Sequence, residues 1–220
     1  MDWPALALSF RLAAVTVLLL MPVAVLLGHA LATRAFAFKR TLEALILLPL
    51  VLPPTVLGYY LLQAFGQTAP LGALWSSLTG SSLAFSFPGL VLASLLFNLP
   101  FAVQPSQRGF ESIAPEIRDA AACSGLSPWQ SLLRIELPLA WPGLLTAAVM
   151  TFAHTLGEFG IVLMVGGAIP SETRTVSIAI YDDVQRFDMG SAGLMSALLV
   201  AVSLGAIALT LRLSAKPRLP

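Results

Sequence analysis

The chain has 220 residues, a net charge of +1, 57% hydrophobic residues and only 10% charged residues. A soluble globular domain carries roughly 25% charged residues, so this composition indicates a chain that folds in an apolar solvent. The near-neutral charge argues against a nucleic-acid partner, which would require a basic surface. One cysteine and two histidines exclude a disulfide framework and do not suggest a metal centre, so no cofactor is expected on this chain.

Five segments are long and apolar enough to predict transmembrane helices, because a bilayer core of roughly 30 Å needs about 20 apolar residues. In chain order they cover approximately residues 12–32, 42–65, 87–103, 142–165 and 191–211. Prolines interrupt the first two, which neighbouring helices can compensate in a membrane bundle. The runs are continuously apolar rather than alternating, which disfavours a β-barrel. We therefore expect residues 1–220 to form one all-α integral membrane domain.

The first segment also has one feature of a secretory signal peptide. Ala30-Leu31-Ala32 resembles a small-residue cleavage site. The flank before the segment holds one acid and one base, Asp2 and Arg11, and the apolar stretch behind them is long. We therefore expect the segment to remain in the protein as a membrane span.

The distribution of lysine and arginine predicts the orientation, because cytoplasmic loops carry an excess of these residues. With the amino terminus outside, nine cations face the cytoplasm and three face the exterior. The nine are Arg34, Lys39, Arg40, Arg108, Arg118, Arg134, Arg212, Lys216 and Arg218, and the three are Arg11, Arg174 and Arg186. We therefore expect the carboxyl terminus and the loop of residues 105–140 to be cytoplasmic.

This loop has a helical pattern of its own. Its first predicted helix starts at Pro115 with Glu116 in the first turn, and ends at Gly125, which is placed for a left-handed cap. A second helix starts at Ser127, and Gln130 three residues later completes a capping box. The pattern alone leaves two interpretations open, a docking element for a partner protein or an amphipathic hairpin on the lipid headgroups.

The same loop resembles the signature of ABC importer permeases. That signature reads Glu-Ala-Ala, three residues, Gly, nine residues, Ile, any residue, Leu-Pro, and this chain departs from it only by an aspartate in the first place. The matching residues are Asp119, Ala120, Ala121, Gly125, Ile135, Leu137 and Pro138, and Glu116 precedes them on the same predicted helix. Residues 47–54, 156–160 and 172–181 are similar to the molybdate branch of the family.

The resemblance implies a type I ABC importer permease fold in the inner membrane, with two copies of the chain forming a homodimer. It also implies two cytoplasmic ATPase subunits, which bind ATP and Mg, and a periplasmic or lipid-anchored protein that delivers the oxyanion. Molybdate is the favoured substrate, with sulfate and tungstate as alternatives. The chain has no Gly-x-x-x-x-Gly-Lys-Ser/Thr phosphate loop, so we expect no enzyme here and ATP hydrolysis on another chain. The helix of residues 115–124 is expected to dock into the ATPase subunit.

The fourth predicted span carries polar residues that we interpret as a lining of the transport pathway. Thr151, His154, Thr155 and Glu158 fall within two helical turns. Ionisable residues inside spans are costly and usually face a bundle interior or water. A carboxylate is a poor ligand for an anion, so we expect Glu158 to pair with His154, Arg174 or the neighbouring subunit. An interhelical bond without a role in transport is the alternative.

Two other classes of membrane protein fit the sequence less well. An intramembrane serine protease needs a Gly-x-Ser-Gly nucleophile in a span, and an aspartyl protease needs two intramembrane aspartates, and the predicted spans contain neither. An ion-coupled secondary carrier often has repeated halves, into which five spans divide awkwardly. Dependence of transport on an ATPase subunit would separate the importer from the carrier.

Overall fold

The computed structural model describes residues 1–214, and all regular structure within that range is helical. The predicted cytoplasmic cations Lys216 and Arg218 lie outside the described residues. In chain order the elements are α1 (Trp3–Thr33), α2 (Lys39–Val51), α3 (Pro54–Phe65), α4 (Pro70–Thr79), α5 (Phe87–Glu111), α6 (Pro115–Cys123), α7 (Pro128–Ser131), a π-helical turn η1 (Leu132–Glu136), α8 (Leu137–Gly157), α9 (Gly160–Gly166), α10 (Val176–Gln185) and α11 (Met189–Ser214).

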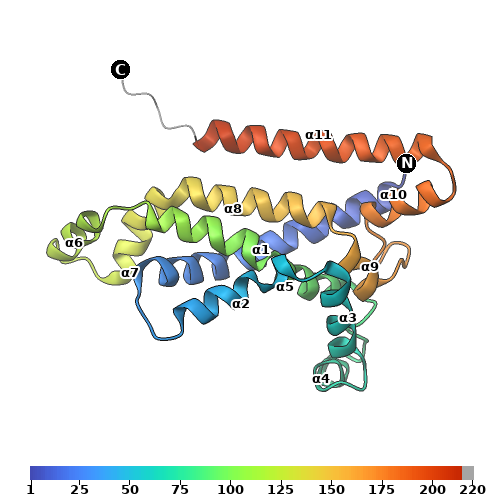
Figure 1. The fold of residues 1–220 in the computed structure, drawn as a ribbon, viewed down its shortest axis with the longest axis horizontal. Coiled ribbons are helices and arrows are strands. Elements are labelled where there is room, and N and C mark those ends of the chain that lie inside the picture. The colour runs from blue at the N-terminus through green and yellow to red at the C-terminus, as the bar shows by residue number, and fades with distance from the viewer. Residues whose placement is uncertain (215–220) are drawn as a thin grey trace.

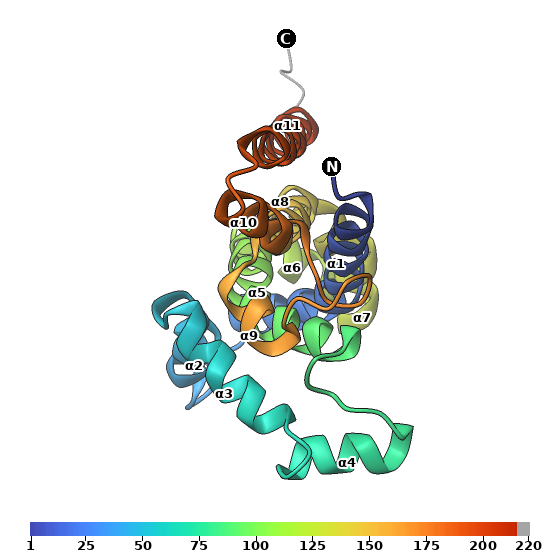
Figure 2. The same ribbon diagram turned by 90° about the vertical axis from the view of Figure 1, so that its right-hand side faces the viewer.

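Three long helices, α1, α5 and α8, pack against one another and form the centre of the molecule (Figures 1 and 2). Glycines allow the close approach. A Cβ added at Gly28 of α1 would lie 2.9 Å from the backbone nitrogen of Gln107, and one at Gly143 of α8 would lie 2.7 Å from Cα of Gly109. Small residues at helix crossings are typical of membrane bundles, where packing replaces the hydrophobic driving force between helices.

Side-chain caps determine where the first and third predicted spans begin. Asp2 Oδ1 accepts a hydrogen bond of 3.0 Å from the backbone N–H of Ala5, and Ser86 Oγ accepts one of 3.3 Å from Gly89. Both helices also have a proline in the first turn, where its missing N–H costs nothing. Helix α1 therefore begins at Trp3, nine residues before the apolar run from which its start was predicted.

The second predicted span, residues 42–65, is not one straight helix. It is divided into α2 and α3, whose axes are bent by 108°. Leu52 and Pro53 between them are extended, with ψ of 136° and 134°, and each precedes a proline. The proline ring disfavours the helical region for the residue before it, so two consecutive prolines force two extended residues. The prolines that interrupt the predicted span thus divide it into two helices.

Within residues 1–214 four helices are long and apolar enough to cross a membrane, namely α1, α5, the continuous helix from Pro128 to Gly157, and α11. The bent pair α2–α3 makes a fifth if it counts as one span. The all-helical fold with about five spans is therefore confirmed. Helix α11 lies along one edge of the molecule against α8 and α10, while α3 and α4 project from the opposite side (Figure 2). Only 11% of the apolar stretch of α11 is buried, which leaves its apolar surface for lipid or a partner.

The ends of the predicted cytoplasmic loop, 105–140, differ from the structure. Helix α5 continues to Glu111, and the next long helix already begins at Pro128, so Pro138 and Pro142 lie inside a helix. The π-helical turn η1 explains the tolerance of Pro138, because the N–H of Leu137 bonds to the carbonyl of Leu132, five residues back. The fourth predicted span also ends early, since α8 stops at Gly157 and α9 follows as a separate helix.

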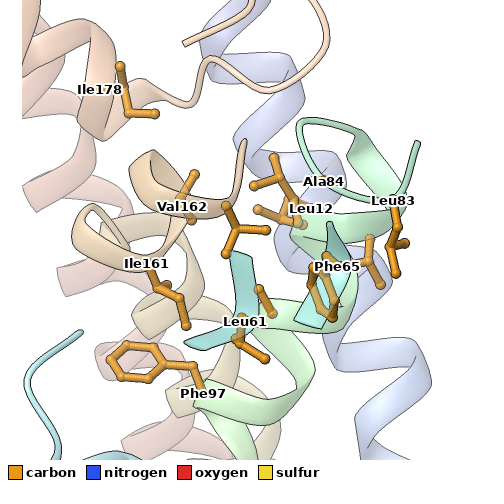
Figure 3. Packing of buried hydrophobic residues seen from close by; sticks show 13 residues of the cluster. Leu12, Leu61, Phe65, Leu83, Ala84, Phe97, Ile161, Val162 and Ile178 are labelled. Atoms are coloured by element: carbon orange, nitrogen blue, oxygen red, sulfur yellow. The ribbon is translucent and has the colours of Figure 1, made fainter. Parts of the chain in front are cut away.

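The largest apolar cluster of the described residues joins the short helices α3 and α9 to the long helices α1 and α5 (Figure 3). It joins Leu12 of α1 and Phe97 of α5 to Leu61 and Phe65 of α3 and to Ile161 of α9. Each of these side chains is at most 9% exposed. The short helices α3 and α9 are therefore attached to the long ones by side-chain packing, even though the chain breaks before each of them.

Candidate functional site

The predicted docking helix is present as α6, and the turn after it has the predicted conformation. Gly125 has φ of +80°, in the left-handed region that glycine adopts without strain. The backbone N–H groups of Gly125 and Leu126 bond to the carbonyls of Ala122 and Ala121, at 3.0 and 3.2 Å. Such bonds satisfy the last carbonyls of a helix. The capping box of Ser127 is also present, which starts the next helix at Pro128.

Four of the predicted docking residues line one hollow beside α6. Glu116, Ala120, Ala121 and Ile135 border a volume of about 390 Å³ between α6 and the following helix. Ala121 is buried, while Glu116, Asp119, Ala120 and Gly125 are exposed. Leu137 and Pro138 lie further along the continuous helix and do not line the hollow, and neither do Asp119 and Gly125. The exposed side of α6 thus presents small and acidic side chains to the space outside the bundle.

The polar residues predicted for the pathway lie where α8 ends. Glu158, the residue after α8, is extended, with ψ of 127°, and its side chain is fully buried. Ser94 Oγ of α5 donates to Glu158 Oε2 at 2.7 Å, and Asn98 Nδ2 donates to Glu158 Oε1. The hydroxyl of Ser177 in α10 donates to the backbone carbonyl of Glu158. The break between α8 and α9 is therefore tied to α5 and to α10 by one residue.

His154 joins this cluster through Asn98 rather than by direct contact with the carboxylate. Its Nδ1 lies 3.0 Å from Asn98 Oδ1 and 3.8 Å from Glu158 Oε1. Asn98 Nδ2 donates both to Glu158 and to the carbonyl of Ser94, which fixes the amide orientation and leaves Oδ1 as the acceptor. His154 Nδ1 must then carry a proton, since an amide oxygen cannot donate. The imidazole also stacks on Phe101, with ring centres 3.9 Å apart.

The two threonines of the predicted lining do not belong to the hydrogen-bonded cluster. Thr155 Oγ1 donates to the carbonyl of Thr151 at 2.8 Å, as threonines in helices commonly do. Thr151 Oγ1 is buried and finds no hydrogen-bond partner among residues 1–214. Both side chains are at most 2% exposed, so neither faces a cavity in this conformation.

A cavity of about 440 Å³ opens beside the cluster, towards the end of α5 that carries the loop. Phe101, the stacking partner of His154, lines it together with Gln104, Arg108 and Thr146. Arg108 contributed only to the count of cations in the sequence, and Gln104 drew no attention there. Ser94 was missed as well. The signal that would have found the two α5 residues is their spacing of three and seven positions after Phe101, which keeps them on one helix face.

One alternative from the sequence was an ion pair between Arg174 and Glu158, and the structure does not contain it. The guanidinium of Arg174 makes ion pairs with Asp2 at 3.0 Å and with Asp182 at 3.1 Å. These contacts join the loop before α10 to the start of α1. In residues 1–214 no group of three or more histidine, cysteine or acidic side chains is arranged to hold a metal ion.

Comparison with known proteins gives a family. A family model described as "Binding-protein-dependent transport system inner membrane component" matches residues 5–216. A molybdenum transport system permease protein, ModB, of Azotobacter vinelandii is 44% identical over 87% of this chain and 84% of its own length. The protein of the same name from Escherichia coli K12 is 33% identical over 94% and 90%. A probable sulfate transport system permease protein, cysT, of Anthoceros angustus is 31% identical over 78% of this chain and 59% of its length.

Solved structures agree at the level of the fold. A crystal structure of a bacterial ABC transporter that imports the polysaccharide alginate has a TM-score of 0.76 at 17% identity, covering 96% of this chain and 79% of that one. The inward-facing methionine ABC transporter MetNI gives 0.71 at 19% identity, covering 97% and 92%. The expected importer-permease fold is thus confirmed. Because the family model spans nearly the whole sequence and the relatives align over most of their length, the chain belongs to the family of binding-protein-dependent transport system inner membrane components.

Proposed function

We propose that this chain is the permease subunit of an importer for molybdate. As a member of its family it is a multi-pass inner-membrane component, and in such systems the ATPase is a separate subunit that works with a binding protein. The assignment of molybdate as the substrate rests on the relatives that are named molybdenum transport permeases. They are 33–44% identical to this chain over most of both chains. The sulfate relative is less similar and aligns over 59% of its length, so sulfate is the second candidate.

The proposed assembly contains two copies of the chain, two ATPase subunits and an external binding protein. Five spans hardly enclose a hydrophilic path alone, whereas two copies related by a two-fold axis bring like faces together around one. The 440 Å³ cavity of one copy is lined by α2, α5 and α8, and supports this arrangement because it lies on the side of the bundle rather than within it.

The proposed orientation has the amino terminus outside and the carboxyl terminus in the cytoplasm. Three basic segments support it: the connection between α1 and α2, the region of α6, and the carboxyl-terminal end of α11 all lie at one end of the molecule (left in Figure 1). That end contains Arg34, Lys39, Arg118 and Arg212, and an excess of cations is typical of the cytoplasmic side.

In this orientation α6 is the contact with the ATPase subunit. Its small exposed residues permit close approach, and the hollow of about 390 Å³ beside it offers a complementary surface. The residues proposed for this contact are Glu116, Asp119, Ala120, Ala121, Gly125, Ile135, Leu137 and Pro138. Closure of the ATPase subunits would then move α6 and, through it, the spans.

The cluster of Glu158, Asn98 and His154 is proposed as the gate, the part of the pathway that opens and closes it to the anion. Glu158 accepts hydrogen bonds from α5 through its carboxylate and from α10 through its backbone carbonyl, so this residue fixes the break between α8 and α9 against both helices. Thr151 and Thr155, one to two turns earlier, would line the path only after α8 moves. The anion itself is expected to meet Gln104 and Arg108 rather than the carboxylate, since like charges repel.

Uptake of radiolabelled molybdate into proteoliposomes tests the proposal. The vesicles would contain this chain with its ATPase, and the binding protein and ATP would be supplied on their respective sides. We expect ATP-dependent uptake that unlabelled tungstate and sulfate reduce to different extents. Uptake by the chain alone, driven by an ion gradient, would show a secondary carrier instead. If sulfate competed better than unlabelled molybdate, sulfate would replace molybdate as the proposed substrate.

The gate role has its own test in the same vesicles. Glu158→Gln keeps the shape of the side chain but replaces one acceptor oxygen by a donor that faces Ser94 or Asn98, both of which donate to Glu158. We expect uptake to fall, with Glu172→Gln, an exposed acid in the loop before α10, as the control. Normal uptake by Glu158→Gln would leave this residue with a packing role only.

A further inference from the structure

Three ionisable side chains from distant parts of the sequence meet next to α6, the proposed docking helix. They are His29 near the end of α1, Arg118 in the middle of α6, and Glu136 at the end of η1. Arg118 Nε donates to Glu136 Oε2 at 2.8 Å, and His29 Nε2 lies 3.2 Å from the same oxygen. In the sequence Arg118 counts only as one of the cytoplasmic cations, and Glu136 occupies the unspecified place between Ile135 and Leu137 of the signature.

Glu136 is buried, with a side chain that is 5% exposed, and both of its oxygens have partners. Ser131 Oγ donates to Oε1 at 3.2 Å, while Arg118 and His29 contact Oε2. A buried carboxylate without a positively charged or hydrogen-bonding partner is strongly destabilising. The folded structure around Glu136 therefore requires the ion pair with Arg118. The contact therefore holds α6 against the start of the long helix that becomes α8.

Arg118 also reaches the end of α5. Its Nη2 donates to the carbonyl of Phe110 at 2.6 Å and its Nη1 to the carbonyl of Ile113 at 3.2 Å. Phe110 lies in the last turn of α5, where backbone oxygens lack partners within the helix, and Ile113 lies just beyond the end of that helix. The imidazole of His29 packs edge-on against the ring of Phe110, with centres 5.2 Å apart. One guanidinium thus contacts α5 and η1, and η1 in turn contacts α1.

Few other contacts attach α6 to the bundle. Within α6 only Ala121 is a buried residue, and the helix packs chiefly on α7. The planar guanidinium with its fixed donors is suited to holding several acceptors in a defined geometry, which a lysine ammonium is not. Besides the chain connections and the packing on α7, Arg118 is the side chain that links α6 to the end of α5 and, through Glu136, to α1.

We propose that Arg118, Glu136 and His29 form a positioning cluster that transmits movement of α6 to α1, α5 and α8. The inference rests on the proposed docking of α6 to the ATPase subunit and adds the route by which the docked helix acts. Arg118 is the central member, because it alone belongs to the moving helix.

The test uses the complete complex of permease, ATPase and binding protein in proteoliposomes. A single change at either Arg118 or Glu136 leaves a buried charge unpaired and can prevent folding, so the informative variant is the double change Arg118→Gln with Glu136→Gln. The control is Arg134→Gln, which removes an exposed cation two residues before Glu136. Three quantities are measured: copurification of the ATPase, hydrolysis stimulated by the binding protein, and molybdate taken up per ATP hydrolysed.

We expect the double variant to copurify with the ATPase, because the outer face of α6 is unchanged. Molybdate uptake per ATP should fall roughly fivefold or more, the usual range for loss of coupling between sites, while Arg134→Gln stays at the wild-type value. Wild-type uptake per ATP in the double variant would overturn the inference, and so would loss of copurification, since the cluster would then shape the docking surface. If the wild-type complex itself showed no stimulated hydrolysis, the proposed function would fail and this inference with it.

Discussion

The crossing of α5 and α8 provides a sharp test of the packing, through the substitution Gly143→Ala. A Cβ at Gly143 would lie 2.7 Å from Cα of Gly109 and 2.7 Å from the carbonyl oxygen of Pro105. Carbon atoms in contact are separated by about 3.5–4.0 Å, so the two helices must move apart by roughly 1 Å. Both neighbours are backbone atoms, and a change of side-chain rotamer cannot relieve the overlap.

Overpacking of this kind costs about 1–3 kcal/mol, and the rigidity of the neighbours favours the upper half of that range. The better helix propensity of alanine offsets about 0.5–1 kcal/mol. The expected net loss of about 1–2.5 kcal/mol corresponds to a decrease in Tm of roughly 2–10 °C for a chain of this size.

The matched control is Gly193→Ala in α11, where an added Cβ has no neighbour within 4 Å among the described residues. This variant keeps the gain in helix propensity and lacks the overlap, so its Tm should equal or exceed that of the wild type. Thermal denaturation of the detergent-solubilised proteins, followed by size-exclusion chromatography, measures both. Equal Tm values for Gly143→Ala and Gly193→Ala would refute the packing of these helices.

Three further substitutions have defined outcomes. At Gly125, whose φ is +80° with open space around it, alanine should cost about 1–2 kcal/mol of turn stability and lower uptake per ATP, while asparagine should be better tolerated; equal uptake by both would argue against a strained turn. Ser9→Ala removes the acceptor of the buried Val176 N–H, at 2.8 Å, and should lower the free energy of unfolding by about 1–3 kcal/mol in a denaturation assay, unless that N–H finds water. Gly72→Ala would place a Cβ 2.2 Å from the carbonyl oxygen of Gly66 and should lower Tm by displacing α4, and an unchanged Tm would contradict the observed turn.

The turns on either side of Gly125 were predictable because their signals are local. The capping box between Ser127 and Gln130 and the left-handed turn at Gly125 act over three or four residues, and the structure contains both. The predicted loop starts at residue 105, where the apolar run of the third span ends, although the helix itself continues beyond that residue. Helix α5 continues to Glu111 through polar residues that pack against α1 and α8.

The polar cluster was only half predictable. Spacing placed His154 and Glu158 on one face, and in the structure His154 Nδ1 lies 3.8 Å from Glu158 Oε1, with Asn98 bridging the two side chains. The partners Ser94 and Asn98 come from α5, some 60 residues earlier in the chain, where no periodicity links them to Glu158. The possible pairing with Arg174 was open in the sequence, and the proximity of Asp2 and Asp182 settled it.

Composition, hydropathy and short-range caps determined by themselves that the chain is a helical membrane protein, roughly where its spans lie, and how the chain turns between α6 and α7. These properties depend on transfer from water to lipid and on hydrogen bonds within one or two turns, both of which a local stretch of sequence specifies. Tertiary structure decided which buried polar groups form hydrogen bonds or ion pairs with one another, as at Glu136 and Glu158. Such pairing depends on helices separated in sequence approaching to within a hydrogen-bond length, and only the packing of the whole bundle sets that distance.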